Sequence, residues 1–216
     1  MIMKYKDHYT DDHEHYNYSR PDPFAGIIYF IHTLEYNKTM IGIIPTDTIY
    51  GVVGPALDKT SVERIYRLRK RDLKKPMIIL ISSVDDLARF GVTTTPAVKK
   101  ILKKVWPGKV SVVLPCTAKK FEYLHRGTKT LAFRLPKPTW LRNFIKTTGP
   151  LVAPSANIQG KPSAHTIRAA KNYFGDKVDF YIDAGRLVSK PSTVVKVEKG
   201  EVTVLRNGAV KVSAAR

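Results

Sequence analysis

Two short segments of the chain carry small hydroxyl and amide side chains directly after an apolar run. The segment PTDTIYG (residues 45–51) follows the run from Met40 to Ile44, and PSAN (154–157) follows LVA (151–153). A loop at the carboxyl end of a strand can line a ligand crevice in an open α/β sheet, where Thr46 and Thr48 could each donate a hydrogen bond to a ligand oxygen. The same hydroxyls could instead cap a turn, so neither segment alone predicts a function.

A strongly basic stretch lies between these two segments. Seven of the ten residues from Arg67 to Pro76 are charged, and six of the seven are basic. Arginine forks and lysine ammonium groups suit a polyphosphate, whose charge must be offset during attack at phosphorus. A solvated helix end is the alternative, but cations this close repel one another, which favours a bound anion.

Several common catalytic signatures are absent from the sequence. It contains no Walker A loop, GxGxxG turn, HExxH pair, GxSxG segment or CxxC pair, which argues against a conventional catalytic triad. Cys116 is the only cysteine, so an intramolecular disulfide and a multi-cysteine metal site are excluded. Because it lies beside a strand-like run, Cys116 is expected to be a buried, inert thiol.

Strands and helices are expected to alternate and to position these segments. Apolar spacing and capping signals predict helices at 22–34, 83–91, 140–146 and 166–174, and two more beginning at Thr60 or Ser61 and at Thr95. Strands are predicted at 40–44, 77–81, 110–114, 131–135, 151–153, 178–182, 193–197 and 202–205. Helix alternation favours parallel pairing, whereas the last two strands suggest a hairpin at Gly200. The predicted fold class is therefore α/β, with a twisted mixed parallel and antiparallel sheet and helices on its faces.

Length and composition predict one folded domain. The chain has 216 residues, of which 43% are hydrophobic and 25% charged, close to average globular usage. Residues 1–21 are rich in Tyr, His, Asp and Asn and are predicted to form a mobile polar tail. Residues 22–210 are predicted to be the folded domain, and 211–216 a short carboxyl-terminal tail.

The formal net charge of the chain is +19. Such a field attracts polyanions, so contact with RNA is favoured over a merely solubilising surface. The apolar runs are far shorter than the roughly 20 residues of a membrane span, and the first residues match neither a signal peptide nor a transit peptide. We therefore expect no membrane association and a cytoplasmic location.

The order and spacing of several motifs resemble those of the YrdC-like threonylcarbamoyl-AMP synthases. The motifs are PTDTIYG, the basic stretch ending in KP, FRLP (133–136), PSANIQGKPS (154–163), PSTVV (191–195) and LRNG (205–208). The resemblance runs from about Phe24 to Gly208 and is to the short, single-domain form of the family. It implies a twisted mixed α/β sheet around a large basic central cavity.

The resemblance also implies a reaction. Threonine, bicarbonate and ATP would give threonylcarbamoyl-AMP and pyrophosphate, and a separate transferase would place the threonylcarbamoyl group on a tRNA adenosine. Mg²⁺ would be held mainly by the phosphates of ATP and by water, so no metal site made by the protein is expected. Threonine's amine can combine with CO₂ to form a carbamate that attacks the α-phosphorus, so the protein mainly has to position anions and neutralise charge.

Residue roles follow by matching motifs. In the resemblance, Thr46 and Thr48 would face threonine or the carbamoyl group, and Arg134 would contact the threonine carboxylate. Asp47 is interpreted as a turn-stabilising residue rather than an outer magnesium ligand.

The nucleotide would be held by basic, hydroxyl and amide side chains: Arg69, Arg71, Lys75, Ser155, Asn157, Ser192 and Arg206. The resemblance makes Arg71 and Lys75 the catalytic residues among them. Arg69 stands where the family usually has lysine, and the two cations are not interchangeable at a phosphate.

Two other functions remain open. An RNA-binding module with a basic cavity and no turnover would show steeply salt-dependent binding. A carbamoyl-adenylating domain with another donor, as in hydrogenase maturation, would not need threonine. Omitting threonine from an assay separates this last possibility from the synthase.

Overall fold

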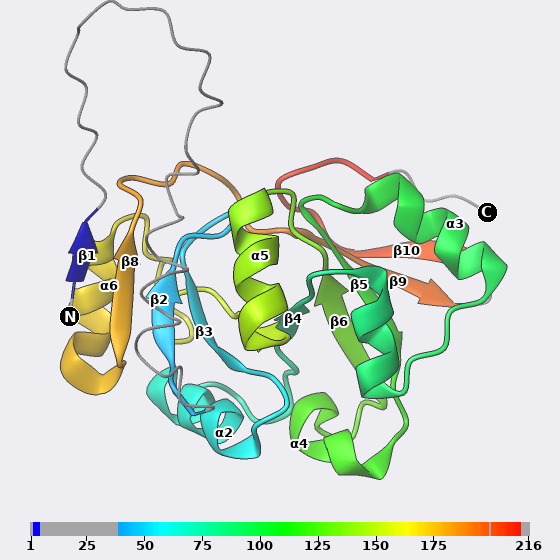
Figure 1. Cartoon of the computed structure of the whole chain (residues 1–216), viewed down its shortest axis with the longest axis horizontal. Coiled ribbons are helices and arrows are strands. Elements are labelled where there is room, and N and C mark those ends of the chain that lie inside the picture. Colours follow the sequence, from blue (N-terminus) through cyan, green and yellow to red (C-terminus); the bar gives the residue numbers. More distant parts are fainter. Residues whose placement is uncertain (1, 5–38, 199, 213–216) are drawn as a thin grey trace, which may run out of the picture.

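One mixed sheet of ten strands forms the centre of the computed structural model, which describes residues 2–4, 39–198 and 200–212 (Figure 1). The strand order is β1-β8-β2-β3-β7-β4-β6-β5-β9-β10. The strands are β1 Ile2–Lys4, β2 Gly42–Ile44, β3 Gly51–Pro55, β4 Ile78–Leu80, β5 Val110–Pro115, β6 Thr130–Arg134, β7 Leu151–Val152, β8 Phe180–Asp183, β9 Thr193–Glu198 and β10 Glu201–Arg206. Parallel pairing joins β8 to β1 and β2, β4 to β6, and β5 to β9, whereas the other neighbours run antiparallel. The predicted mixed α/β sheet is confirmed.

Helices cover this sheet. The α-helices are α2 Lys59–Leu68, α3 Pro96–Val105, α4 Glu122–His125, α5 Thr139–Thr148 and α6 Ile167–Phe174. In the described residues, 3₁₀ helices cover Val84–Phe90, Lys119–Phe121 and Gly175–Lys177. In Figure 1, α5 lies across the face of the sheet turned toward the viewer, and α6 lies beside β8. None of the helices in the described part of the chain is long and apolar enough to cross a bilayer.

Alternate residues of the central strands pack on opposite faces, as the two-residue period of a strand requires. On β2, Ile43 belongs to a large apolar cluster that includes residues of α2 and α6, whereas Ile44 belongs to a smaller cluster with α5. The same alternation separates Ile79 from Leu80 on β4. Because both faces are buried, these strands read in the sequence as continuous apolar runs.

Most of the predicted elements after residue 39 are confirmed, and β3 is the main one that the prediction missed. Its sequence, GVVGP, contains residues that usually mark a loop. Gly54 is needed there because a Cβ atom at this position would lie 2.8 Å from Ile41 and 3.1 Å from Ile65 of α2. Helix α2 also begins earlier than predicted, since the carboxylate of Asp58 accepts hydrogen bonds from the first backbone amides.

The amino-terminal segment differs in part from the predicted mobile tail. Residues 2–4 form β1, which pairs in parallel with β8. An edge strand presents unpaired backbone groups that a short segment can satisfy whatever its side chains, which tail-like composition does not reveal. The rest of the predicted tail, the predicted helix at 22–34 and residues 213–216 lie outside the described residues.

Helix α2 ends in a tight turn that directs the basic stretch back toward the sheet. The amide of Arg71 donates to the carbonyl of Tyr66 (3.0 Å), and the amide of Lys70 donates to that of Arg67 (3.1 Å). This pair of bonds usually closes a helix around a glycine. Lys70 occupies the glycine position with φ 47°, where its Cβ crowds the backbone.

Replacing Lys70 with glycine should therefore stabilise the fold. We expect Lys70→Gly to raise the free energy of unfolding by about 0.5–1 kcal/mol, because the strained φ is relieved. Arg67→Gly, three residues earlier inside the same helix, should lower it by about 1 kcal/mol. Urea denaturation of both variants checks the prediction, which is wrong if they change stability in the same direction.

Candidate active site

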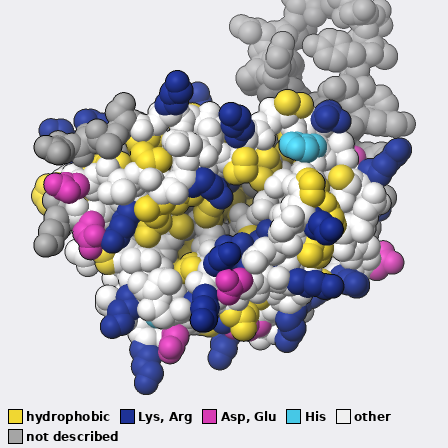
Figure 2. Space-filling view, turned by 180° about the vertical axis from the view of Figure 1, so that it is seen from behind, with side chains coloured by type: hydrophobic (Ala, Val, Ile, Leu, Met, Phe, Trp, Pro, Cys, Tyr) yellow, Lys and Arg dark blue, Asp and Glu magenta, His cyan; other side chains and the backbone are white. Residues whose placement is uncertain are grey.

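A cavity of about 350 Å³ is lined by four arginines, namely Arg69, Arg71, Arg134 and Arg206. Figure 2 shows Lys and Arg side chains spread over one face of the molecule, with few acidic side chains among them. No Asp or Glu of the described chain lines the cavity. Such a cavity carries a strong positive potential and suits a ligand with several negative charges.

The floor of the cavity is apolar and is made by neighbouring strands. It is formed by Ile78 of β4, Val113 of β5, Ala132 of β6 and Val194 of β9. A floor of this kind fits a planar or aliphatic part of a ligand, whereas polar groups at the rim fix its orientation.

The two polar segments singled out in the sequence lie side by side. Gly51 bridges to Ser155, and the amide of Val52 donates to the carbonyl of Pro154 (2.9 Å). The amide of Ala156 donates back to the carbonyl of Tyr50 (2.8 Å). These backbone bonds bring residues about a hundred positions apart to one wall of the cavity.

The two threonines of the first segment form a directed chain of hydrogen bonds. The hydroxyl of Thr46 donates to the carbonyl of Ile49 (2.7 Å), so its single proton is used. The contact of 3.1 Å between the Thr46 and Thr48 hydroxyls must then be donated by Thr48. Both hydroxyl protons are therefore donated within the loop. Thr48 faces the cavity as a hydrogen-bond acceptor rather than as the expected donor.

Arg69 joins the end of α2 to the PSAN segment. Its Nε donates to the carbonyl of Asn157 (3.0 Å), and its Nη2 donates to the Asn157 amide oxygen (2.8 Å) and the Ser155 hydroxyl (3.1 Å). Its Nη1 is buried without a protein partner. Burial, helped by the charge of Arg71, lowers the pKa of Arg69 to about 10, which leaves the side chain charged at neutral pH.

Arg71 is fixed by the backbone that follows it. Its Nε donates to the carbonyl of Lys75 (3.0 Å) and its Nη2 to that of Pro76 (2.8 Å). Lys75 does not line the cavity: its side chain is 63% exposed and its ammonium lies 3.8 Å from a carboxylate oxygen of Asp72. In this structure the carbonyl of Lys75 helps to hold Arg71, and the phosphate contact of its ammonium stays a prediction.

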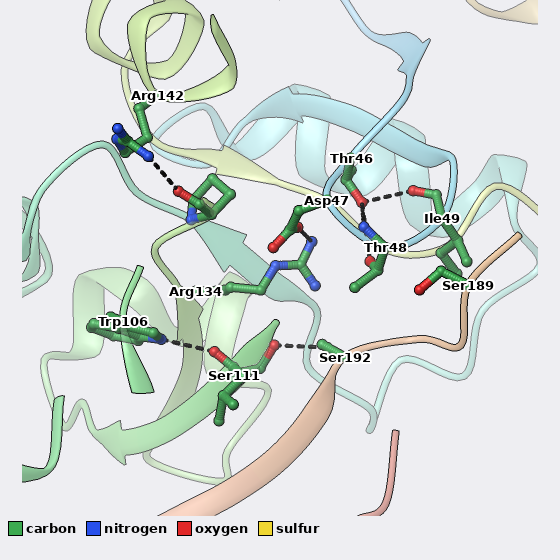
Figure 3. Close-up of polar contacts among 12 residues, drawn as sticks. Thr46, Asp47, Thr48, Ile49, Trp106, Ser111, Arg134, Arg142, Ser189 and Ser192 are labelled. Atoms are coloured by element: carbon green, nitrogen blue, oxygen red, sulfur yellow. Dashed lines mark hydrogen bonds and ion pairs between the residues drawn. The ribbon is translucent and has the colours of Figure 1, made fainter. Parts of the chain in front are cut away.

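The segments PSTVV and LRNG are fastened together at the opposite wall. Arg206 donates from Nη2 to the carbonyl of Ser192 (2.8 Å), and the Ser192 hydroxyl lies 2.9 Å from that of Ser111 (Figure 3). Gly208 allows this approach, since a Cβ there would lie 2.3 Å from the carbonyl oxygen of Pro191. Ser192 and Arg206 both line the cavity.

Arg134 differs from the other three arginines because it forms an ion pair. Its Nη2 lies 3.2 Å from a carboxylate oxygen of Asp47, and the two side chains are 4% and 2% exposed (Figure 3). Burial raises the pKa of Asp47 above its ordinary value although Arg134 acts to lower it, and burial likewise lowers the pKa of Arg134. Asp47 was expected to stabilise its turn. In the structure its charged partner is Arg134, and its own amide and that of Lys137 also act to lower its pKa.

Eight of the ten residues expected at the site line the cavity, and Lys75 and Asn157 do not. Asn157 is 7% exposed and supports Arg69 from behind. Thr128 and Thr130 also line the cavity and were not predicted. The period of a strand could have identified Thr130, because Thr130, Ala132 and Arg134 share one face of β6. Cys116 is buried, as predicted.

The described residues contain no cluster of three or more His, Cys, Asp or Glu side chains placed to hold a metal ion. The cavity walls also present hydroxyl and guanidinium groups instead of the carboxylates that Mg²⁺ prefers. The side chains at this site therefore do not fit a metal ion held by the protein itself.

Comparison with known proteins gives a consistent result. The family model Sua5/YciO/YrdC, described as "Telomere recombination", matches residues 36–208. The threonylcarbamoyl-AMP synthase of Pyrococcus abyssi is 32% identical over 168 residues, which are 77% of this chain and 49% of that protein. The threonylcarbamoyl-AMP synthase of Marinobacter nauticus is 30% identical over 73% of this chain and 84% of that protein.

A solved structure agrees with these sequence matches. The crystal structure of Pyrococcus abyssi Sua5 complexed with L-threonine superimposes with a TM-score of 0.73 at 31% identity, covering 79% of this chain and 51% of that one. The chain thus spans about half the length of the Pyrococcus relative. Because the family model covers well over half of the residues, the chain belongs to the Sua5/YciO/YrdC family.

Proposed function

We propose that the chain is an L-threonylcarbamoyladenylate synthase, a nucleotidyltransferase that makes threonylcarbamoyl-AMP and pyrophosphate from threonine, bicarbonate and ATP. The observation that carries the proposal is a cavity with four guanidinium groups, of which only Arg134 has a carboxylate partner among the described residues. Relatives named threonylcarbamoyl-AMP synthase support it, as does the threonine complex of the Pyrococcus protein.

The chemistry needs no nucleophile from the protein. The amine of threonine and CO₂ from bicarbonate form a carbamate, and a carbamate oxygen attacks the α-phosphorus of ATP while the bond to pyrophosphate breaks. Negative charge shifts onto the phosphate oxygens during this step, so fixed cations stabilise the transition state. Arg69, Arg71 and Arg206 are held by neutral oxygens and keep their charge for this purpose.

The roles of the remaining residues follow from their place on the walls. Ser155 and Ser192 lie beside Arg69 and Arg206 and would contact the α-phosphate region. Arg134 and the Thr46–Thr48 loop would receive threonine and the carbamoyl group. Mg²⁺ would enter with ATP, bound to its phosphates and to water, where it offsets their charge.

The outer surface supports a further partner. The net charge of +19 exceeds what one nucleotide site needs, so we propose that RNA, tRNA in particular, contacts the basic surface and that a tRNA threonylcarbamoyl-transferase receives the product. The proposed location is the cytoplasm, where tRNA and ATP are at hand. The RNA-binding alternative without turnover differs by predicting no product at all.

A substrate-omission assay tests the proposed reaction. Purified protein with Mg²⁺, ATP, threonine and bicarbonate should form threonylcarbamoyl-AMP, detected by chromatography and mass spectrometry, together with an equal amount of pyrophosphate. Leaving out threonine or bicarbonate should abolish both products. Pyrophosphate release that persists without threonine would favour another donor, and no release under any condition would contradict the proposal.

Removing the guanidinium of Arg71 should slow this reaction without unfolding the chain. Arg71→Ala is expected to lower kcat/KM for ATP at least about tenfold, since a charged hydrogen bond used in the transition state contributes about 1.5–3 kcal/mol. Arg168→Ala, at an exposed position of α6 outside the cavity, is the matched control and should leave the rate unchanged. Equal rates for the two variants would remove Arg71 from the site.

Asn157 should act on the nucleotide through Arg69, because it lies behind the cavity wall. Asn157→Ala removes one side-chain acceptor of the buried Arg69 guanidinium and should destabilise the fold by about 1–3 kcal/mol while weakening ATP binding. Asn143→Ala, at an exposed position of α5, is the control, and thermal melting with and without ATP measures both effects. Normal stability of Asn157→Ala would contradict the supporting role.

A further inference from the structure

The four arginines of the cavity are held by two different kinds of partner. Arg69, Arg71 and Arg206 donate their hydrogen bonds to carbonyl, hydroxyl and amide oxygens, which carry no net charge. Arg134 alone among these four forms an ion pair within the described chain, with Asp47. The positive charge is therefore unevenly distributed. The end with Arg69, Arg71 and Arg206 keeps its positive charge, whereas the end with Arg134 is close to neutral.

Asp47 is buried in an unusual way for a carboxylate. Its side chain is 2% exposed, and neither of its oxygens accepts a hydrogen bond with good geometry. Two positive charges act to lower the pKa of Asp47, that of Arg134 on β6 and that of Lys109 in the loop before β5. The backbone amides of Asp47 itself and of Lys137 act in the same direction. The positive charge of Arg206 acts on Arg134 and lowers its pKa. The attraction within a buried ion pair offsets the lost hydration only when the pair is also well hydrogen-bonded. A buried carboxylate with so few donors is therefore poorly explained by a contribution to stability.

We propose that Asp47 is a positioning and specificity-determining residue that neutralises Arg134 and so reserves it for the carboxylate of a zwitterionic amino acid. This inference rests on the proposed function and deepens it by assigning the two ends of the cavity. Phosphate groups are kept at the end formed by Arg69, Arg71 and Arg206.

The electrostatic reason lies in the total charge of each ligand. A phosphate dianion at Arg134 would lie close to the carboxylate of Asp47 and be repelled by it. An amino acid brings a single carboxylate for Arg134 and an ammonium that Asp47 attracts. Thr48 adds an acceptor at the same end, because its hydroxyl proton is spent on Thr46. Without Asp47, all four arginines would compete for phosphate.

The test compares Asp47→Asn with Asp85→Asn, an exposed aspartate in the 3₁₀ helix Val84–Phe90, using sulfate as the phosphate probe. In the wild type, sulfate should compete with ATP and not with threonine. In Asp47→Asn, sulfate should compete with both, and KM for threonine should rise at least about tenfold while KM for ATP changes less than about threefold. Asp47→Glu should restore part of the discrimination, which a purely structural role would not predict.

An unchanged KM for threonine in a folded Asp47→Asn, with sulfate still not competing, would overturn the inference. Should this variant fail to fold, the wild type provides the second measurement. Sulfate stays a dianion and threonine a zwitterion as pH falls from neutral, whereas the raised pKa of Asp47 brings its protonation closer to neutral pH. Competition between sulfate and threonine should therefore appear on acidification, and its absence down to the limit of stability would also overturn the inference.

The failure of the proposed function is distinguishable from the failure of this inference. Threonine binding and its displacement by sulfate can be followed by calorimetry without turnover. A protein that binds threonine as described but forms no threonylcarbamoyl-AMP would contradict the synthase alone. A protein that forms the product with Asp47→Asn as well as with the wild type, at the same KM for threonine, would contradict the role of Asp47 alone.

Discussion

Four guanidinium groups within one cavity repel one another, and the surrounding structure is arranged to hold them there. Two unit charges 4 Å apart repel by about 4 kcal/mol at an effective dielectric constant of about 20, so each arginine needs its own anchor. Arg69, Arg71 and Arg206 are anchored by carbonyl, hydroxyl and amide oxygens. Because these anchors carry no net charge, the positive potential is left for a ligand, and burial lowers the pKa of all three arginines.

The anchors come from segments that are far apart in the sequence, so the sheet has to bring them together first. The bonds between the 45–51 and 154–157 segments form one wall, and the contact of Arg206 with Ser192 forms another. Close backbone approach requires glycine at Gly54 and Gly208, where a Cβ atom would collide with neighbouring atoms. The cations are thus fixed before a ligand arrives, which is the condition for electrostatic stabilisation of a transition state.

The sequence predicted the parts of this arrangement that depend on local pattern. Strands buried on both faces are continuous apolar runs, and the helix caps at Thr95 and Thr166 follow local rules, so these elements were found. Strand β3 was missed because Gly54 serves packing against α2 and Gly51 the approach of Thr46 and Pro154, rather than a turn. The donor direction of Thr46 and Thr48, the outward position of Lys75 and the supporting place of Asn157 depend on tertiary neighbours, which residue type does not encode.

Asp47 shows most clearly where a motif stops being informative. Within PTDTIYG it has the composition of a turn residue, and only the folded sheet, in which β3, β7 and β4 lie between β2 and β6, brings Arg134 within reach of it. Once buried there, the pair gains too little attraction to offset the loss of hydration, as the raised pKa of Asp47 indicates. A buried carboxylate that removes charge from an anion site is explained if one guanidinium must differ from the other three. The proposed reaction would impose that difference, because it brings two kinds of anion, a polyphosphate and the carboxylate of an amino acid.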